Sequence, residues 1–362
     1  MLWALFLIVI FIGGAGALIY LVTRFHKFSF IRKIGEKNRF LSWLAAAVPV
    51  LLLASIILYN TFAASVVILH TALFFILSDL GSAVYRRITK KERSQKYYAG
   101  IVAIVLTVFA MAGAFFCAWH VFRTHYEFNT VKNVGNIRVA MIADAHLGIT
   151  LDGRRFAEQM ERIDAENADV LIVNGDFVDD DSVREDMVEA CAAFGRMKTP
   201  VIFVWGNHDR GYYNSRDFTG EDLMNELERN GVTILRDESI LINDTFYVVA
   251  REDRRTEERA TVEELLAPLD KSKYIITADH QPGNFDEEHE FGADLVLSGH
   301  THGGHIWPSG YFAYWTGEND GIWGLYTRGD TNCVVTSGIS GWAIPFKTGT
   351  YSEYVIIDVY GK

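Results

Sequence analysis

The sequence has few cysteines, and they do not form a metal-binding pattern. Three cysteines occur in 362 residues, without the spacing of a metal-binding motif. Cys117 lies in an apolar run, which leaves Cys191 and Cys333 as the possible disulfide partners in the rest of the chain. Because Cys191 falls in a predicted helix and Cys333 in a predicted strand, we expect two buried free thiols. A disulfide is the alternative if the compartment is oxidising.

Acidic residues are nearly absent from the first third of the chain. Residues 1–120 hold 12 of the 34 Lys and Arg residues but only 3 of the 45 Asp and Glu residues. Residues 121–362 therefore carry a formal charge of about −20. Such an acidic part repels the phosphates of nucleic acid, so we expect no nucleic-acid partner. It also repels an anionic lipid surface unless something tethers it there.

Charged residues are also nearly absent from four long apolar runs, with Asp79 in the third as the exception, and these runs supply the tether. Each is close to the roughly 20 residues that a helix needs to cross a bilayer, and they cover residues 1–22, 41–59, 62–84 and 98–121. The first run lacks a basic leading segment, and it exceeds the roughly 7–15 apolar residues of a cleaved signal peptide. We therefore predict four retained transmembrane helices.

The loops between these runs predict a topology. The loops after the first and third runs are rich in Lys and Arg, whereas the connection at Asn60 and Thr61 carries no charge. The positive-inside rule places both basic loops in the cytoplasm. The chain is then a multi-pass protein of the cell membrane, and the part that follows the helices is extracytoplasmic. We expect a transmembrane domain at 1–121, a linker at 122–136 and a globular domain at 137–362.

The globular part alternates between strand and helix patterns, as in an α/β fold. Five short apolar runs have the composition of strands buried on both faces, and they read IRVAMIAD, DVLIVNGD, PVIFVWGNHD, KYIITADH and DLVLSGH. Amphipathic stretches at 153–167, 184–196 and 220–230 are predicted helices between them. Since sites form beyond the carboxyl ends of such strands, we expect the terminal polar residues of all five runs to meet at one rim.

Those terminal residues have the chemistry of metal ligands. They are Asp144, His146, Asp176, Asp179, Asn207, His208, His280, His300 and His302. Carboxylate, amide and imidazole ligands together suit Mn, Fe or Zn. A third histidine, His305, follows in the stretch LSGHTHGGHIW, and the sequence leaves its role open.

The ordered motifs DAH, GDFVD, GNHD, ADHQP and GHTHGGH resemble those of the calcineurin-like metallophosphoesterases, and most closely the bacterial membrane-associated branch. The resemblance covers about residues 138–362. It implies a four-layer α/β/β/α sandwich with two divalent metal ions at the rim. By resemblance, Asp176 bridges the ions, Asp144, His146 and His302 complete one set of ligands, and Asn207, His280 and His300 complete the other.

The resemblance also implies a mechanism. Metal-bound hydroxide attacks phosphorus, and His208 acts as the general acid. Asp179 and Asp209 are expected to orient the ligands or His208. Arg251, Arg254 and His305 are candidates for substrate binding, although a solvated charged turn explains the two arginines equally well. An aromatic-rich stretch at 307–326 is either core or a lip at the membrane interface, and the tether favours the lip.

These features and the resemblance predict a membrane-anchored, dinuclear metal-dependent phosphoesterase, and the resemblance to the membrane-associated branch implies a preference for phosphodiesters. The expected partners are the lipid bilayer and a phosphoester substrate that is membrane-proximal or lipid-linked. A pyrophosphatase of a nucleotide-linked lipid is one alternative. It is disfavoured because such substrates are cytoplasmic, whereas the predicted topology places the globular domain outside the cytoplasm. A catalytically silent membrane sensor is the other, and it is disfavoured because all seven expected ligands are present. The oligomeric state stays open.

Overall fold

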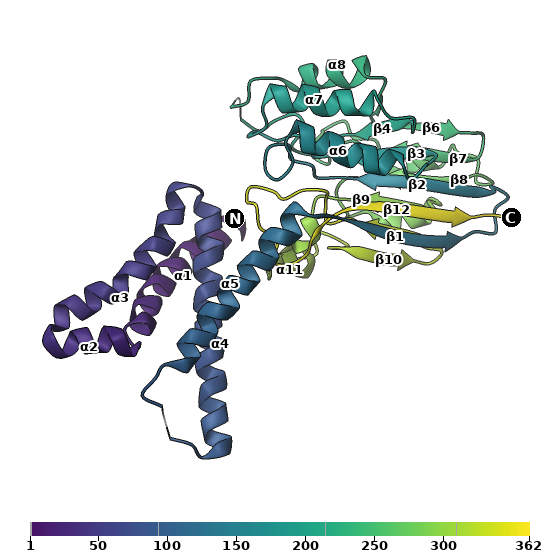
Figure 1. The fold of residues 1–362 in the computed structure, drawn as a ribbon. Helices are drawn as coiled ribbons and strands as arrows, with labels where there is room; N and C mark the ends of the chain where they lie inside the picture. The colour runs from purple at the N-terminus through teal and green to yellow at the C-terminus, as the bar shows by residue number, and fades with distance from the viewer. Residues whose placement is uncertain (1, 93, 214, 309) are drawn as a thin grey trace. The chain divides into compact units, whose positions relative to one another are not determined.

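The computed structural model describes residues 2–92, 94–213, 215–308 and 310–362, with the backbone alone for residues 2–11 and 313. The chain divides into two compact units, Met1–Ala114 and Phe115–Lys362. The first is helical and the second contains both sheets (Figure 1). Each unit has its own hydrophobic core.

The helical unit is built from long apolar helices. Its elements are α1 (Leu2–Phe25), α2 (Ser29–Lys37), α3 (Arg39–Ala54), the 3₁₀ turn η1 (Ser55–Leu58), α4 (Thr61–Thr89) and α5 (Tyr98–Trp119), whose last turn belongs to the second unit. Two of the helix starts are capped by asparagine: the Asn38 side chain accepts a hydrogen bond from the Leu41 N–H, and the Asn60 side chain accepts one from the Ala63 N–H. These caps satisfy N–H groups that have no partner within the helix.

Three helices in the described residues are long and apolar enough to cross a bilayer. They span Arg39–Leu58, Thr61–Thr89 and Tyr98–Trp119 and correspond to the last three predicted runs. The first half of the first predicted span, at residues 1–22, lies outside the residues whose side chains are described. The part that is described forms a shorter apolar helix, Ile12–Phe25. The helices support association of the chain with a membrane.

The second unit contains two six-stranded mixed sheets. The first has the order β1-β12-β2-β3-β4-β5, in which β12 and β2 are antiparallel and the other neighbours are parallel. Its strands are β1 (Val121–Asn129), β2 (Asn136–Ile142), β3 (Val170–Asn174), β4 (Val201–Val204), β5 (Thr233–Leu235) and β12 (Ser352–Tyr360).

The second sheet has the order β10-β11-β9-β8-β7-β6, with antiparallel pairs at both edges and parallel pairs in the centre. Its strands are β6 (Glu238–Ile242), β7 (Phe246–Ala250), β8 (Tyr274–Ala278), β9 (Leu295–Ser298), β10 (Gly324–Arg328) and β11 (Thr331–Val335). Buried side chains of both sheets form one cluster between them, which includes Val139 and Ile172 from the first sheet and Val248 and Ile276 from the second.

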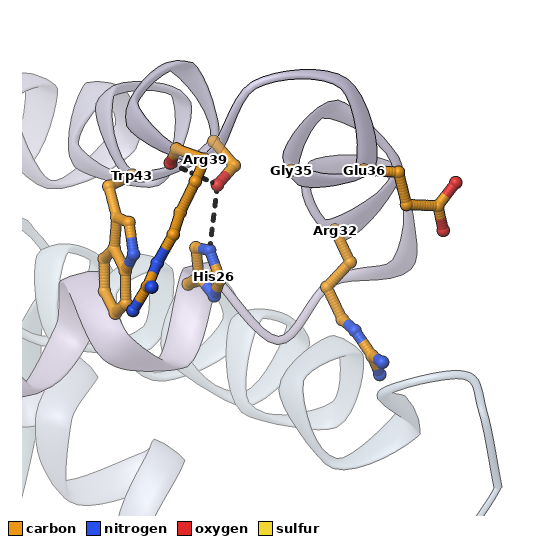
Figure 2. Close-up of a pocket in the computed structure, with 7 residues that line it drawn as sticks. His26, Arg32, Gly35, Glu36, Arg39 and Trp43 are labelled. Carbon is orange, nitrogen blue, oxygen red and sulfur yellow. Dashed lines mark hydrogen bonds between the residues drawn. The ribbon is translucent and has the colours of Figure 1, made fainter.

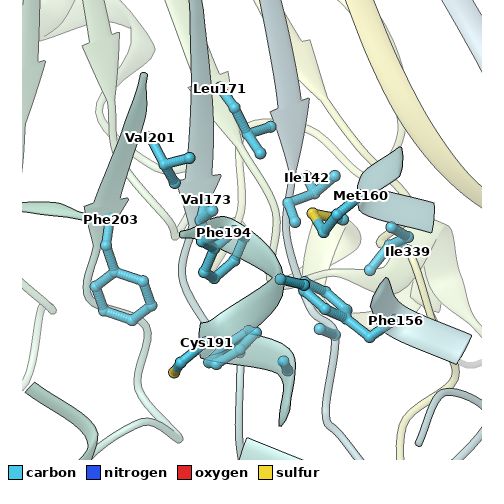
Figure 3. Packing of buried hydrophobic residues seen from close by; sticks show 14 of the residues in the cluster. Ile142, Phe156, Met160, Leu171, Val173, Cys191, Phe194, Val201, Phe203 and Ile339 are labelled. Atoms are coloured by element: carbon cyan, nitrogen blue, oxygen red, sulfur yellow. The ribbon is translucent and has the colours of Figure 1, made fainter. Parts of the chain in front are cut away.

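Helices cover the outer faces of the two sheets. The first sheet is covered by α6 (Gly153–Asp164), α7 (Arg184–Phe194) and α8 (Gly220–Arg229), and the second by α9 (Val262–Leu266) and α10 (Phe285–Glu290). The remaining elements are η2 (His302–Gly304) and α11 (Gly310–Trp315). Figure 3 shows how Phe156 and Phe194 of the covering helices pack against Val173 and Phe203 of the sheet. The predicted four-layer α/β/β/α sandwich is therefore confirmed.

The prediction of a linker at 122–136 is wrong for most of its length, because Val121–Asn129 form strand β1. This strand pairs in parallel with β12 over nine residues, from Val121–Ser352 to Asn129–Tyr360. Strand β12 is buried along almost its whole length, so β1 covers an edge that would otherwise expose unpaired backbone groups. The three predicted helices are present as α6, α7 and α8, and each ends one to three residues before its predicted limit.

Cys191 lies in α7 and Cys333 in β11, as expected, and both are buried free thiols. Apolar neighbours surround each of them. The disulfide alternative is therefore wrong for this fold.

Candidate metal centre

The polar residues that follow five strands meet at one rim of the sandwich. Asp144 follows β2, Asp176 follows β3 and Asn207 follows β4, all in the first sheet. His280 follows β8 and His300 follows β9 in the second sheet. The rim therefore collects residues from both sheets, as expected for sites beyond the carboxyl ends of strands.

The backbone at this rim is held in an unusual conformation. Positive φ angles, which non-glycine residues rarely adopt, occur at Asp144 (56°), His146 (36°), Asp176 (52°), His300 (67°) and His302 (50°). Residues held in such sparsely populated regions cluster at functional sites, where the surrounding fold enforces them. The concentration of five such residues at one rim marks it as the functional region of this unit.

A glycine makes the close approach of two strand ends possible. A Cβ atom on Gly206 would lie 2.2 Å from both the backbone nitrogen and Oδ1 of Asp176. Such a contact is impossible, so any side chain at position 206 would push apart the loops that follow β3 and β4.

The first group of candidate ligands consists of Asp144, His146 and His302, whose ligand atoms all lie within 4.8 Å of one another. His146 Nε2 is 3.2 Å from His302 Nε2, and His302 Nε2 is 3.4 Å from Asp144 Oδ1. The other ring nitrogen of His146, Nδ1, donates a hydrogen bond to Asp179 Oδ2 at 3.1 Å. That bond fixes the tautomer and leaves the Nε2 lone pair available for a metal ion.

The second group consists of Asp176, His280 and His300. His280 Nε2 lies 3.1 Å from Asp176 Oδ2, and its Nδ1 donates to the Asn174 carbonyl oxygen at 2.7 Å. A carbonyl oxygen can only accept a hydrogen bond, so His280 is held in the tautomer that leaves Nε2 without a proton when the ring is neutral. The His300 ring lies edge-on to that of His280, with centroids 5.3 Å apart.

One carboxylate oxygen joins the two groups. Asp176 Oδ2 is 3.1 Å from His280 Nε2 and 3.8 Å from His146 Nε2. Its second oxygen, Oδ1, accepts a hydrogen bond from the His208 N–H at 2.8 Å. Asp176 therefore stands between the two groups, where a carboxylate can offset the repulsion between two nearby cations.

Asn207 lies beside the second group and is held by two neighbours. Gln281 Nε2 donates to Asn207 Oδ1 at 3.1 Å, and Asn207 Nδ2 donates to the Tyr212 hydroxyl at 2.8 Å. These contacts fix which end of the amide carries the oxygen, which is the atom that can bind a metal ion.

Asp209 connects the loops of the site by hydrogen bonds to their backbone. It is fully buried, and its Oδ1 accepts from the N–H groups of Phe177 (2.8 Å) and Val178 (3.2 Å). Its Oδ2 accepts from the N–H groups of Asp176 (3.0 Å) and Gly206 (2.8 Å). A single carboxylate thus fixes the backbone after β3 to the backbone after β4.

Burial and mutual interactions shift the pKa values of these groups in different directions. Burial disfavours the Asp176 carboxylate, but the imidazoles of His280 and His146 outweigh this effect and lower its pKa. Burial raises the pKa of Asp144 to about 6. Burial also lowers the pKa of His300 to about 3 and that of His302 well below its usual value. These two imidazoles are therefore neutral near pH 7, the state in which histidine binds metals.

His208 occupies a different position from the candidate ligands. Its ring is edge-on to His146 (centroids 5.0 Å apart), Tyr212 (4.8 Å) and Trp342 (6.0 Å). Burial lowers its pKa. It lies next to both groups, with its backbone bonded to Asp176, so its ring can reach a substrate held between them.

The three candidate substrate-binding residues have different surroundings. Arg251 is 4% exposed and donates to Asp279 Oδ2 at 2.8 Å, so it belongs to a buried ion pair. The Arg254 guanidinium donates to the Gln281 carbonyl oxygen at 3.2 Å, and Arg254 is close enough for its charge to lower the pKa of His300. His305 is buried, its ring lies 5.6 Å from that of His302, and burial lowers its pKa to about 3.

Several residues at the site were not predicted from the sequence. Gln281 follows His280 directly and Tyr212 follows His208 by four residues, so proximity along the chain could have indicated both. Trp342, whose ring also stacks at 6.2 Å from that of His302, comes from a distant loop and had no such signal.

The arrangement fits a pair of divalent cations. Each group offers carboxylate and imidazole donors, which suit Mn, Fe or Zn. The Nε2 atoms of His146 and His302 face one another at 3.2 Å, as two imidazole ligands of one ion would. In addition, the buried Nδ1 of His300 has no hydrogen-bond partner among the described residues, and a buried polar atom of this kind calls for a ligand.

Residues 137–304 match the family model of the calcineurin-like phosphoesterases, and this part of the chain is therefore a calcineurin-like metallophosphoesterase domain. The family uses dinuclear divalent metal centres. A protein of Aquifex aeolicus described as an uncharacterized metallophosphoesterase is 29% identical over 240 residues, which is 62% of this chain and 86% of that protein.

Two vertebrate proteins give further points of comparison. A transmembrane protein with a metallophosphoesterase domain from Danio rerio is 27% identical over 236 residues, covering 61% of this chain and 53% of that protein. The crystal structure of a dimetal phosphatase from Danio rerio covers 62% of this chain and 93% of that chain, with 13% identity and a TM-score of 0.37. The first of these proteins is described by name as a transmembrane protein that carries a metallophosphoesterase domain.

Proposed function

We propose that the chain is a membrane-anchored, dinuclear metal-dependent phosphodiesterase. The observation that carries this proposal is the pair of ligand groups joined by Asp176 Oδ2. In this proposal Asp144, His146 and His302 hold one ion, Asn207, His280 and His300 hold the other, and Asp176 binds both. Two such ions supply positive charge that clamps a phosphoryl group and lowers the pKa of water.

The protein's own residues position the substrate and move a proton. His208 is the proposed general acid, which donates a proton to the leaving oxygen. Burial lowers its pKa, but the negative charge of a bound phosphodiester acts in the opposite direction and favours the protonated ring. Asp179 and Asp209 keep His146 and the two ligand loops in place, and Arg254 is the better placed of the two arginines to contact the substrate.

We further propose that the substrate is close to the bilayer, for example a lipid headgroup or a lipid-linked phosphoester. Four aromatic side chains of the 307–326 stretch are exposed, namely Trp307, Tyr311, Tyr314 and Trp315. Trp and Tyr favour the headgroup level of a membrane, which supports the predicted lip. Equal activity of wild type and a W315A variant in lipid nanodiscs as well as in detergent would contradict this role.

The catalytic unit is proposed to be extracytoplasmic, with several spans in the membrane. The support is the positive charge of the loops after the first and third apolar runs. Protease added to intact cells is expected to remove the catalytic unit. Protection of this unit in intact cells, with cleavage after lysis, would reverse the proposed topology.

The decisive experiment measures hydrolysis of bis-p-nitrophenyl phosphate by the purified chain with Mn²⁺. The Asp176→Asn variant tests the bridge, and Asp181→Asn is the matched control, because Asp181 is an exposed carboxylate in the same loop. We expect D176N to lose both activity and one of two bound ions, whereas D181N keeps both. Full activity in D176N would refute the assignment, and a wild type that binds two ions without hydrolysing the diester would refute the phosphodiesterase.

A further inference from the structure

A cavity in the helical unit has the character of an anion-binding site. Its volume is about 670 Å³, within the roughly 300–1,000 Å³ of ordinary ligand sites. It is lined by the segment after α1, by α2, by the last turns of α4, by the α4–α5 loop and by the start of α5. All of these residues belong to the first unit, so the cavity is independent of the proposed phosphodiesterase.

The lining carries an excess of positive charge. It includes five basic side chains, Lys27, Arg32, Arg86, Lys91 and Lys96, against the two acidic side chains of Asp79 and Glu92. The start of α5 in the wall adds the positive end of a 22-residue helix. The net charge of the cavity therefore favours an anion.

Asp79 does not neutralise this excess of positive charge, because its carboxylate already forms ion pairs and a hydrogen bond with other residues. Its Oδ2 is 2.9 Å from the Arg24 guanidinium and 3.1 Å from Lys27 Nζ, and its Oδ1 accepts from the Tyr97 hydroxyl at 2.8 Å. Arg32, Arg86 and Lys96, by contrast, form no ion pair within the part of the chain that the structure describes. Lys91, which donates to the Tyr85 hydroxyl, forms none there either, so four cations line the cavity against the remaining acidic group of Glu92.

The wall of the cavity is preorganised on the side of α2. The ring of His26 stacks on Trp43 with centroids 4.0 Å apart, and its Nε2 is 3.1 Å from Ser42 Oγ. Figure 2 shows this pair in the adjoining cavity of about 360 Å³, with Glu36 directed away from the His26 ring. His26 and Arg32 line both cavities, so the stacked His26 ring gives this side of the wall a fixed element.

The position of the cavity indicates which anion it takes. It lies at the end of α4 and the beginning of α5, two helices of membrane-spanning length, where lipid headgroups meet water. The tyrosines Tyr85, Tyr97 and Tyr98 also line it, and tyrosine is enriched at that level. Basic pockets between transmembrane helices bind anionic phosphate headgroups.

We propose that this cavity binds a phosphate group, carried either by an anionic lipid or by a small soluble molecule. Guanidinium groups match phosphate oxygens in pairs, which gives Arg32 and Arg86 the central role. Nothing in this proposal requires the catalytic metal centre, so its failure leaves the phosphodiesterase unaffected.

The test uses the full-length chain in two arms. Native mass spectrometry counts phosphatidylglycerol retained by protein from nanodiscs of phosphatidylcholine with phosphatidylglycerol, and inorganic phosphate is titrated against the lipid-poor protein in detergent, with thermal unfolding as the readout. The pocket variant is R32Q/R86Q. The matched control is K33Q/R87Q, which removes the same charge from the adjacent positions that do not line the cavity.

If the site binds a lipid headgroup, R32Q/R86Q should retain roughly 30-fold less phosphatidylglycerol, because each of the two lost charges is worth about a factor of five. Retention by K33Q/R87Q should stay nearly unchanged. If inorganic phosphate stabilises the wild type but not R32Q/R86Q, and the wild type retains no phosphatidylglycerol, the site binds a soluble phosphate. Equal losses in the two variants would show diffuse surface charge and overturn the proposal. Wild type that responds to neither probe would overturn it regardless of how the variants fold.

Discussion

Replacing Asp209 by asparagine should destabilise the loops of the rim without replacing any candidate metal ligand. Asparagine keeps one oxygen, which can still accept from the N–H groups of Phe177 and Val178. Its amide nitrogen then faces the N–H groups of Asp176 and Gly206, which are now 3.0 and 2.8 Å from Asp209 Oδ2. Two buried donors lose their acceptor and meet a third donor instead.

The expected cost follows from those two contacts. Each buried donor left without a partner costs about 1–3 kcal/mol, so D209N should lose about 2–6 kcal/mol, against about 5–15 kcal/mol for a typical domain. For a unit of this size, each kcal/mol corresponds to about 2–4 °C in Tm. Because the two donors belong to the loops after β3 and β4, metal affinity should also fall about 10- to 100-fold.

The assay is thermal unfolding of the full chain followed by circular dichroism, together with metal content measured by mass spectrometry. D181N again serves as the control, because it removes one negative charge from an exposed position and should change Tm by a degree or less. A D209N variant with the Tm and metal content of the wild type would refute the conclusion that this carboxylate fastens the two loops.

Three other outcomes are expected. H208A should lower kcat about 10²- to 10⁴-fold with unchanged metal content, whereas a loss of bound metal would show that His208 is a ligand. R251M should lower the stability by about 3–5 kcal/mol in chemical denaturation, since it leaves the Asp279 carboxylate buried with one partner fewer, and a stable variant would place Arg251 outside the core. Burial raises the pKa values of Cys191 and Cys333, so both should resist a thiol reagent until the protein unfolds, and fast labelling of the folded chain would contradict their burial.

The layers of the fold and the membership of its rim were predictable because they depend on local patterns. Short apolar runs that each end in a polar residue identify buried strands, and the carboxyl ends of such strands meet at one edge. Asp144, Asp176 and His280 could therefore be placed together although they are far apart in the sequence. The family motifs added the division of the residues into two sets, which the ligand groups in the structure resemble.

What could not be predicted depends on partners distant in the chain. The segment VFRTHYEFN alternates between apolar and polar residues only weakly, and its partner β12 lies more than 220 residues later, so its sequence predicts a linker. Arg251 lies in a charged stretch that has the composition of a solvated turn. Only the fold brings Asp279, 28 residues further on, within 2.8 Å of it and buries the pair.

The place of Asp176 between the two candidate ligand groups has a consequence for how the proposed centre would fill. If one carboxylate serves two cations, the occupancy of either position changes the electrostatic potential at the other, and this coupling is reciprocal by thermodynamic linkage. A cation held by one group would repel a cation at the other, whereas an Asp176 side chain already ordered by the first would favour the second. The balance would decide whether the two positions fill cooperatively or one after the other. A metal titration of this protein should accordingly show two interdependent steps, so that the availability of metal, as well as that of substrate, sets the fraction of active enzyme.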